Sequence, residues 1–124
     1  MLVDTDVLID FLRGNEKAVD FLIEHSADLF ASAVTVAELY QGVRDGEEKI
    51  KLATTLSSIE ILPVTTEIAE LAGIFRRDNR ARIGCGLADC MIAATATHHQ
   101  LSLATLNAKH FSMIDNVVTP YAKE

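Results

Sequence analysis

The chain is poor in cysteine and proline. Its two cysteines, Cys85 and Cys90, are too few for the disulfide scaffold of a small secreted domain. A single Cys-x4-Cys pair is also not a zinc-binding spacing, so we expect two reduced thiols, one of them in the core. The two prolines, Pro63 and Pro120, each follow a short apolar segment and are typical of strand exits. No linker rich in proline or glycine, no repeat and no low-complexity segment divides the chain.

Long apolar runs are also missing. None approaches the roughly 20 residues of a membrane-spanning helix. The first apolar stretch starts at the N-terminus without the basic region of a signal peptide. We therefore expect a cytoplasmic protein.

Positive charge is scarce, since 11 Lys and Arg face 18 Asp and Glu, for a formal net charge of −7. This balance argues against a nonspecific nucleic-acid binder, which is normally basic. It does not exclude a nuclease, because bound cations can neutralise an acidic site. One local basic patch exists at Arg76, Arg77, Arg80 and Arg82. It is equally consistent with phosphate binding and with a solvated helix end whose cations favour the helix dipole.

The remaining composition indicates one folded domain over residues 1–124, because 49% of the residues are apolar. Short apolar segments alternate with segments of helical periodicity, which predicts an α/β fold with a central parallel sheet of about four to five strands flanked by helices. Strands are expected at residues 1–5, 28–33, 59–64, 101–105 and 116–119. Helices are expected at residues 6–13, 15–25, from 35, 46–58, 66–81 and 88–99, with N-caps at Asp6, Asn15, Thr35 and Thr66.

Three carboxylates lie within or beside apolar runs, at Asp4, Glu38 and Asp89. Burying an unpaired carboxylate is costly, so three such positions suggest a shared site. Converging acids usually hold a divalent cation. In a parallel sheet the site forms beyond the carboxyl ends of the strands, where Asp4 and Asn107 would also lie.

Each acid also has a purely structural explanation. Glu38 fits the N3 position of a Thr-x-x-Glu capping box that starts at Thr35. Asp89 fits the first turn of a helix, where the dipole favours a negative charge. For Asp6 we favour the role of N-cap over that of a ligand, and Asp10, one turn later, is expected to face water.

Four segments, VDTDVLIDFL, SAVTVAEL, LADCMIAATA and LATLNAKHF, occur in this order along the chain. In this order they resemble the PIN-domain family, and specifically the VapC-type toxins of toxin–antitoxin modules. The resemblance covers nearly the whole chain. It implies a metal-dependent endoribonuclease that hydrolyses RNA phosphodiester bonds, with Mg²⁺ or Mn²⁺ as cofactor. It also implies a cognate antitoxin as partner and a homodimer.

The resemblance implies that Asp4, Glu38 and Asp89 are the catalytic and metal-binding acids, with Thr5 as the small hydroxyl residue beside the first acid. Many PIN domains carry a fourth acid in the segment that here reads TLNAKHF, which has no carboxylate. Asn107 is a candidate neutral substitute, and Asp115, a few residues later, is a candidate replacement charge. Asp6 is a further candidate residue of the site. We expect one tightly held cation, with a second recruited by the RNA phosphate.

Three other functions are compatible with parts of the sequence. Asp4 and Asp6 match the D-x-D opening of haloacid-dehalogenase-like phosphatases, with Asp4 as nucleophile and Asp6 as acid and base. A PIN-like module that only binds a partner is a second alternative. Histidine chemistry without a metal is the third, but the spacing of His25, His98, His99 and His110 predicts no acid–base pair.

Overall fold

Five short strands form one parallel sheet in the computed structural model, which describes residues 1–81 and 85–122. Their order is β3-β2-β1-β4-β5, and every adjacent pair is parallel. The predicted α/β class and parallel sheet are confirmed. The strands are shorter than expected; they are β1 (Leu2–Val3), β2 (Phe30–Ser32), β3 (Glu60–Leu62), β4 (Leu103–Ala104) and β5 (Val117–Val118).

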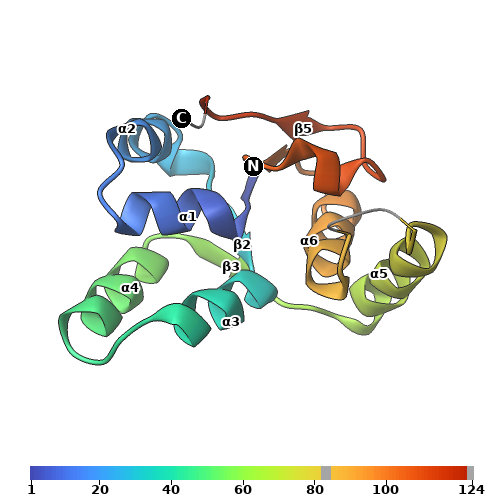
Figure 1. The fold of residues 1–124 in the computed structure, drawn as a ribbon, viewed down its shortest axis with the longest axis horizontal. Coiled ribbons are helices and arrows are strands. Elements are labelled where there is room, and N and C mark those ends of the chain that lie inside the picture. Colours follow the sequence, from blue (N-terminus) through green and yellow to red (C-terminus); the bar gives the residue numbers. More distant parts are fainter. Residues whose placement is uncertain (82–84, 123–124) are drawn as a thin grey trace.

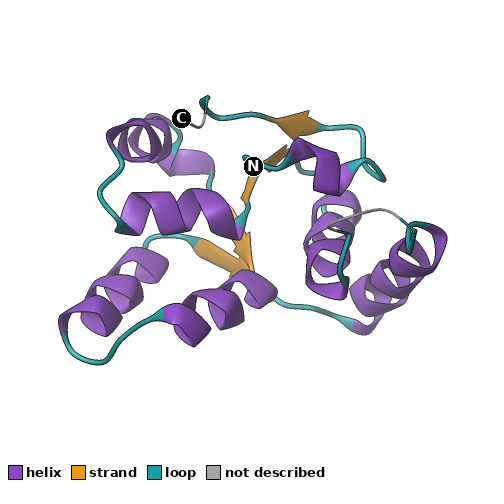
Figure 2. Ribbon diagram, viewed as in Figure 1, coloured by secondary structure: helices purple, strands orange, loops and turns teal. Residues whose placement is uncertain are grey.

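Helices connect the strands and cover the sheet on both sides (Figures 1 and 2). Each parallel connection needs a crossover, and helices fill these crossovers. The helices are α1 (Thr5–Leu12), α2 (Glu16–Glu24), α3 (Ala33–Gly42), α4 (Glu47–Ser57), α5 (Thr66–Asp78) and α6 (Leu87–His98), with short 3₁₀ turns η1 (Ser26–Asp28) and η2 (Ala108–Phe111). None of the described helices is long and apolar enough to cross a membrane.

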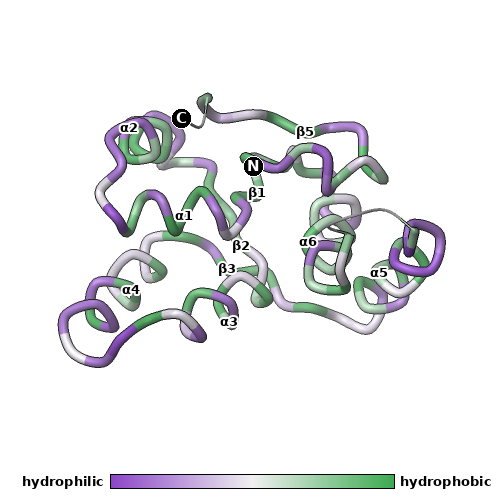
Figure 3. Tube along the Cα trace, in the orientation of Figure 1, coloured by the Kyte–Doolittle hydropathy of each residue, from purple (hydrophilic) through white to green (hydrophobic). Residues whose placement is uncertain are grey.

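The core has two sides because successive side chains of a strand point to opposite faces. Val3 of β1 packs with residues of α1 to α4, while the neighbouring Leu2 packs with residues of α6 and η2. Figure 1 shows the same division, with α1 to α4 on one side of the strands and α5 and α6 on the other. Hydrophilic residues gather at the α3–α4 connection and at the end of α5 (Figure 3).

Helix α6 is the most buried helix of the domain. Its central residues from Ile92 to Ala96 are at most 1% exposed. Small alanine side chains on α6 let it approach both the sheet and α5, where Ala94 packs with Ile68 and Ala72. This packing fixes the first turn of α6, which carries Asp89, against the carboxyl edge of the sheet.

The helix N-caps correct several predictions. Asn15 caps α2 as expected, with its Oδ1 accepting from Lys17 and Ala18. The predicted cap at Thr35 is wrong, because α3 begins two residues earlier and its cap is Ser32. The predicted caps at Asp6 and Thr66 are also wrong, because Asp4 caps α1 and Thr65 caps α5.

Asp10 was predicted to face water, and this is wrong. Its residue is 8% exposed, and its Oδ2 accepts a hydrogen bond of 2.9 Å from the Tyr121 hydroxyl. The contact joins α1 to the segment that follows β5, 111 residues later in the chain. Helical periodicity could not predict this partner, because it lies at the far end of the sequence.

Helix α4 offers a test of this core with a matched control. Leu52 is 0% exposed in the core, whereas Ile50 on the same helix is 68% exposed. Because Leu52→Ala leaves a cavity, it should lower the free energy of unfolding by about 2–5 kcal/mol. Ile50→Ala should change it by less than about 0.5 kcal/mol. Urea denaturation measures both, and equal effects would contradict the packing described for α4.

Candidate active site

Asp4 stands where β1 ends, beside the end of β4. Because Val3 is in register with Ala104, the next residues, Asp4 and Thr105, come side by side. The backbone N–H of Asp4 donates to the Ala104 carbonyl at 2.9 Å. The Thr105 hydroxyl donates to Asp4 Oδ2 at 2.7 Å, and the Thr5 backbone N–H donates to Oδ1 at 2.8 Å. Both carboxylate oxygens of Asp4 are therefore held by donors from two segments about 100 residues apart.

Burial decides the charge state of Asp4, which is only 6% exposed. The pKa of the Asp4 carboxyl is raised to about 7, chiefly by burial and then by the negative charges of Asp6 and Asp89, against the lowering effect of the hydrogen bonds from Thr105 and Thr5. The donors thus offset only part of the cost of desolvation and repulsion. Asp4 therefore binds a proton at a higher pH than a solvated aspartate does.

Glu38 reaches the site from the second turn of α3. Its Oε1 accepts a hydrogen bond of 2.7 Å from the Thr5 hydroxyl, and the Thr5 and Thr35 hydroxyl oxygens lie 3.0 Å apart. A hydroxyl has one hydrogen, so Thr5 can donate to Glu38 while it accepts from Thr35. This chain of contacts fixes the direction of the Glu38 carboxylate. The structure therefore gives Thr35 a buried position in this network in place of the predicted cap.

Asp89 enters from the first turn of α6 and faces η2. Its Oδ2 lies 3.6 Å from His110 Nδ1, and both side chains are 27% exposed. Burial raises the pKa of the Asp89 carboxyl, the nearby His110 lowers it, and the charges of Glu38 and Asp6 raise it. Contacts of Thr105 with Asp4 and Asp6, and of Thr5 with Glu38, bring three acids to one carboxyl edge of the sheet. Asp89 lies near enough for the charges of Glu38 and Asp6 to raise its pKa.

Asp6 and Asn107 are joined directly. Asp6 Oδ2 accepts from the Asn107 side-chain amide at 2.9 Å and from the Leu106 backbone N–H at 3.1 Å. The Thr105 hydroxyl lies 3.5 Å from the same oxygen. Asp6 therefore holds the loop that follows β4.

The structure does not bring the other candidate residues to this edge. Asp115 is exposed and precedes β5, so it lies at the amino edge of the sheet. Arg76 and Arg77 form the last turn of α5, where Arg77 pairs with Asp78. Arg82 lies outside the described residues.

Two residues of the site had no predicted role. Thr105 is fully buried and donates to the most buried acid, and His110 faces Asp89. The only signal for them was their place in the TLNAKHF segment, at the end of a predicted strand. Sequence spacing could not show the contact of His110, because its partner lies on another element.

The donor set fits a hard divalent cation. It consists of carboxylate oxygens, and burial followed by mutual repulsion raises the pKa of Asp4 and Asp89. Carboxylates suit Mg²⁺ and Mn²⁺. Within residues 1–81 and 85–122, no group of three or more acidic, histidine or cysteine side chains is arranged so that it could hold a metal ion. A cation such as Mg²⁺, which keeps several waters, can be bound through only one or two carboxylates.

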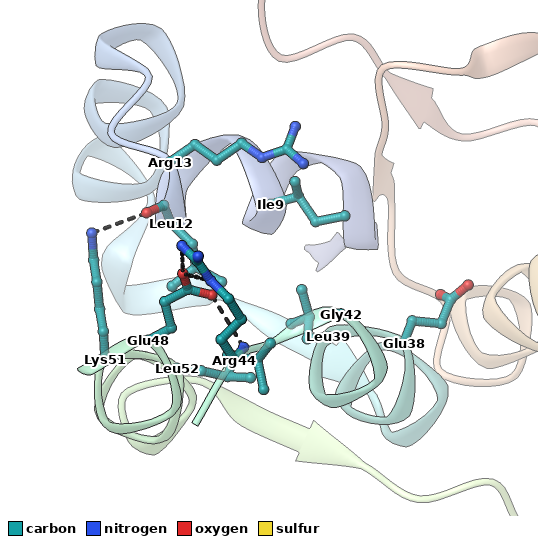
Figure 4. A pocket seen from close by; sticks show the side chains of 11 residues that line it. Ile9, Leu12, Arg13, Glu38, Leu39, Gly42, Arg44, Glu48, Lys51 and Leu52 are labelled. Atoms are coloured by element: carbon teal, nitrogen blue, oxygen red, sulfur yellow. Dashed lines mark hydrogen bonds and ion pairs between the residues drawn. The ribbon is translucent and has the colours of Figure 1, made fainter. Parts of the chain in front are cut away.

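A pocket of about 520 Å³ opens beside the acids between α1, α3 and α4 (Figure 4). Its walls are apolar, and Glu38 lies at one end of it. Charged side chains line the opposite end, where Arg44 pairs with Glu48 and the Lys51 ammonium donates to the Leu12 carbonyl at 3.0 Å. The apolar lining residues are Ile9, Leu12, Leu39, Val43 and Leu52.

The two cysteines are free and both buried, which confirms the prediction of reduced thiols and places both in the interior. Cys85 Sγ donates to the His110 carbonyl at 3.3 Å. Burial raises the pKa of the Cys90 thiol. Cys85 therefore helps to fix η2 beside the start of α6.

Residues 1–116 match the family model described as PIN domain. Ribonuclease VapC10 of Mycobacterium tuberculosis is 42% identical over 125 residues, which cover 98% of this chain and 93% of that protein. A toxin–antitoxin complex from Klebsiella pneumoniae contains a chain of 32% identity and a TM-score of 0.86, with 98% of each chain covered. The structure of FitAcB from Neisseria gonorrhoeae matches at 31% identity and a TM-score of 0.77, with 96% of each chain covered.

The raised pKa of Asp4 predicts how stability depends on pH when no cation is present. The folded protein holds a proton that the unfolded chain releases near pH 4, so stability should fall as pH rises from about 4 to about 7. Asp89 acts in the same direction. The contribution of one such group is at most about 1.4 kcal/mol per pH unit.

Thermal unfolding in EDTA between pH 5 and pH 8 measures this dependence. Asp4→Asn should flatten the curve and raise the melting temperature at pH 8, because the buried charge is gone. Asp20→Asn, on the exposed face of α2, should leave the curve unchanged. A wild-type protein that gains stability from pH 5 to pH 8 would contradict the assignment.

Proposed function

We propose that this chain, which belongs to the PIN-domain family and its VapC-type ribonucleases, is the toxin of a toxin–antitoxin pair and hydrolyses RNA with the help of Mg²⁺ or Mn²⁺. The observation that carries the proposal is the gathering of four carboxylates from three segments of the chain, two of them with raised pKa. A cluster that repels itself in this way is suited to holding a cation, and strongly perturbed acids mark functional sites.

A bound divalent cation would supply a more acidic water and neutralise charge on the scissile phosphate. Asp4, at the end of β1, and Asp89, in the first turn of α6, would hold it. Glu38, whose direction is set by the Thr5 hydroxyl, would orient the attacking water and accept its proton. Thr105 would keep Asp4 in place through its 2.7 Å bond.

This function accounts for the acidity of the chain. A formal net charge of −7 repels RNA, so the phosphate can approach only where cations neutralise the acids. The exposed Lys109 and the basic end of α5 are candidates for contacts with the RNA backbone. The haloacid-dehalogenase alternative is disfavoured, because both oxygens of Asp4, its nucleophile, are held in hydrogen bonds.

The partner is a cognate antitoxin that blocks the acidic edge. The pocket between α1, α3 and α4 would receive apolar side chains of that partner, and it leads to Glu38. An arginine of the antitoxin could then pair with the carboxylates in place of the cation. We also propose a cytoplasmic location and a homodimer, for which Ile74 of α5 and Leu87 of α6 offer apolar side chains, 45% and 50% exposed.

Nuclease assays on a structured RNA test the function. The purified protein, free of antitoxin, should cleave the RNA with Mn²⁺ or Mg²⁺ and stop in EDTA. Asp4→Asn, Glu38→Gln and Asp89→Asn should each lower the rate by roughly 100-fold, because each removes a group that holds the cation or water.

Asp20→Asn is the matched control, since it removes one carboxylate from an exposed position on α2 and should keep full activity. Circular dichroism establishes that the variants are folded. Cleavage that persists in EDTA, or full activity in Asp4→Asn, would refute the metal-dependent mechanism. A wild-type protein that binds its partner but cleaves no RNA with Mn²⁺ or Mg²⁺ would favour a PIN-like module that only binds.

A further inference from the structure

The TLNAKHF segment has no acid, yet the structure places a carboxylate against it. Asp6 projects from the first turn of α1, and its Oδ2 receives the Asn107 side-chain amide at 2.9 Å and the Leu106 backbone N–H at 3.1 Å. Two donors from the loop after β4 thus converge on one oxygen of a residue 100 positions earlier.

We propose that Asp6 carries the fourth negative charge of the acidic site and that Asn107 is its neutral hydrogen-bond donor. In this arrangement a carboxylate on α1 replaces one that the loop after β4 lacks. The role of Asp6 in metal binding rests on the proposed function. The hydrogen bond between Asp6 and Asn107 does not depend on nuclease activity.

The charge of Asp6 acts on the same site as the other acids. It raises the pKa of both Asp4 and Asp89. The Thr105 hydroxyl oxygen lies 2.7 Å from Asp4 Oδ2 and 3.5 Å from Asp6 Oδ2, so the two carboxylates are neighbours and Asp6 adds to the field that a cation at Asp4 would experience. Asp6 therefore contributes charge to the site as well as structure.

A chain of hydrogen bonds connects Asp6 to Asp4. Asp6 accepts from the Asn107 side chain, and the Asn107 backbone N–H donates to the Thr105 hydroxyl oxygen at 3.0 Å. The Thr105 hydroxyl in turn donates to Asp4 at 2.7 Å. Asp6 is thus a positioning residue for the most buried acid. Asn107 has its amide turned to Asp6, which explains why a neutral residue suits that place.

Only one of the two positions can carry a charge. An aspartate at 107 would bring a second carboxylate to the place where the amide now lies, 2.9 Å from Asp6 Oδ2. Two carboxylates at such a distance repel, and one of them would have to take up a proton. An exchange of the two residues keeps one charge and one amide, with the donor and the acceptor reversed.

A double-mutant cycle in EDTA tests the pairing without any metal or RNA. Asn107→Asp should lower the melting temperature at pH 7.5 by roughly 5 °C, a typical shift for the loss of one such interaction in a small domain. The exchanged variant, with both Asp6→Asn and Asn107→Asp, should recover most of that loss. An undiminished melting temperature in Asn107→Asp, or additive single effects, would overturn the pairing.

Calorimetry with Mn²⁺ alone tests the charge. Asp6→Asn should weaken binding by roughly 10- to 100-fold, the usual cost of removing a group that supports a metal ligand. The exchanged variant should recover most of the affinity, and Asp20→Asn should bind as the wild type does. Equal affinity in Asp6→Asn and Asp20→Asn would overturn the role of Asp6. If the wild type binds Mn²⁺ but cleaves no RNA, the proposed function fails while this result stands.

Discussion

The buried charge of Asp4 is the constraint around which the carboxyl edge of the sheet is organised. Pairing of β1 with β4 forces this side chain into the interior, and donors from Thr5 and Thr105 then meet both of its oxygens. They compensate the desolvation only in part, since the pKa stays near 7. A bound cation would relieve the part of the desolvation cost that these donors do not offset. The buried Asp4 carboxylate therefore both lowers stability and favours cation binding.

Different contacts hold each of the other acids of the site in place. Hydroxyl contacts from Thr5 and Thr35 fix Glu38, His110 faces Asp89, and the loop after β4 holds Asp6. The three acids come from three helices, Asp6 from α1, Glu38 from α3 and Asp89 from α6. A parallel sheet makes this convergence possible, since the carboxyl ends of all its strands face the same way.

Periodicity predicted the kind and order of all the main helices and strands, because apolar spacing reports which face of an element is buried. It was less able to predict where helices begin. Ser32 and Thr65 are caps one to three residues before the predicted threonines, because several adjacent residues can all serve as caps and the chain path chooses among them. Periodicity also predicts a solvent-facing Asp10, which is wrong because its hydrogen-bond partner, Tyr121, follows the last strand.

The sequence by itself determined the fold class, the three acids and the family resemblance, because apolar periodicity and motif order are local properties of the chain. The tertiary structure alone decided how those acids are held. Thr105, His110 and the bond between Asp6 and Asn107 depend on contacts across the sheet edge. Such contacts arise from strand register and helix packing, which bring together residues that no spacing rule relates. For that reason the loop that looked deficient in charge is in fact paired with a carboxylate from the opposite end of the chain.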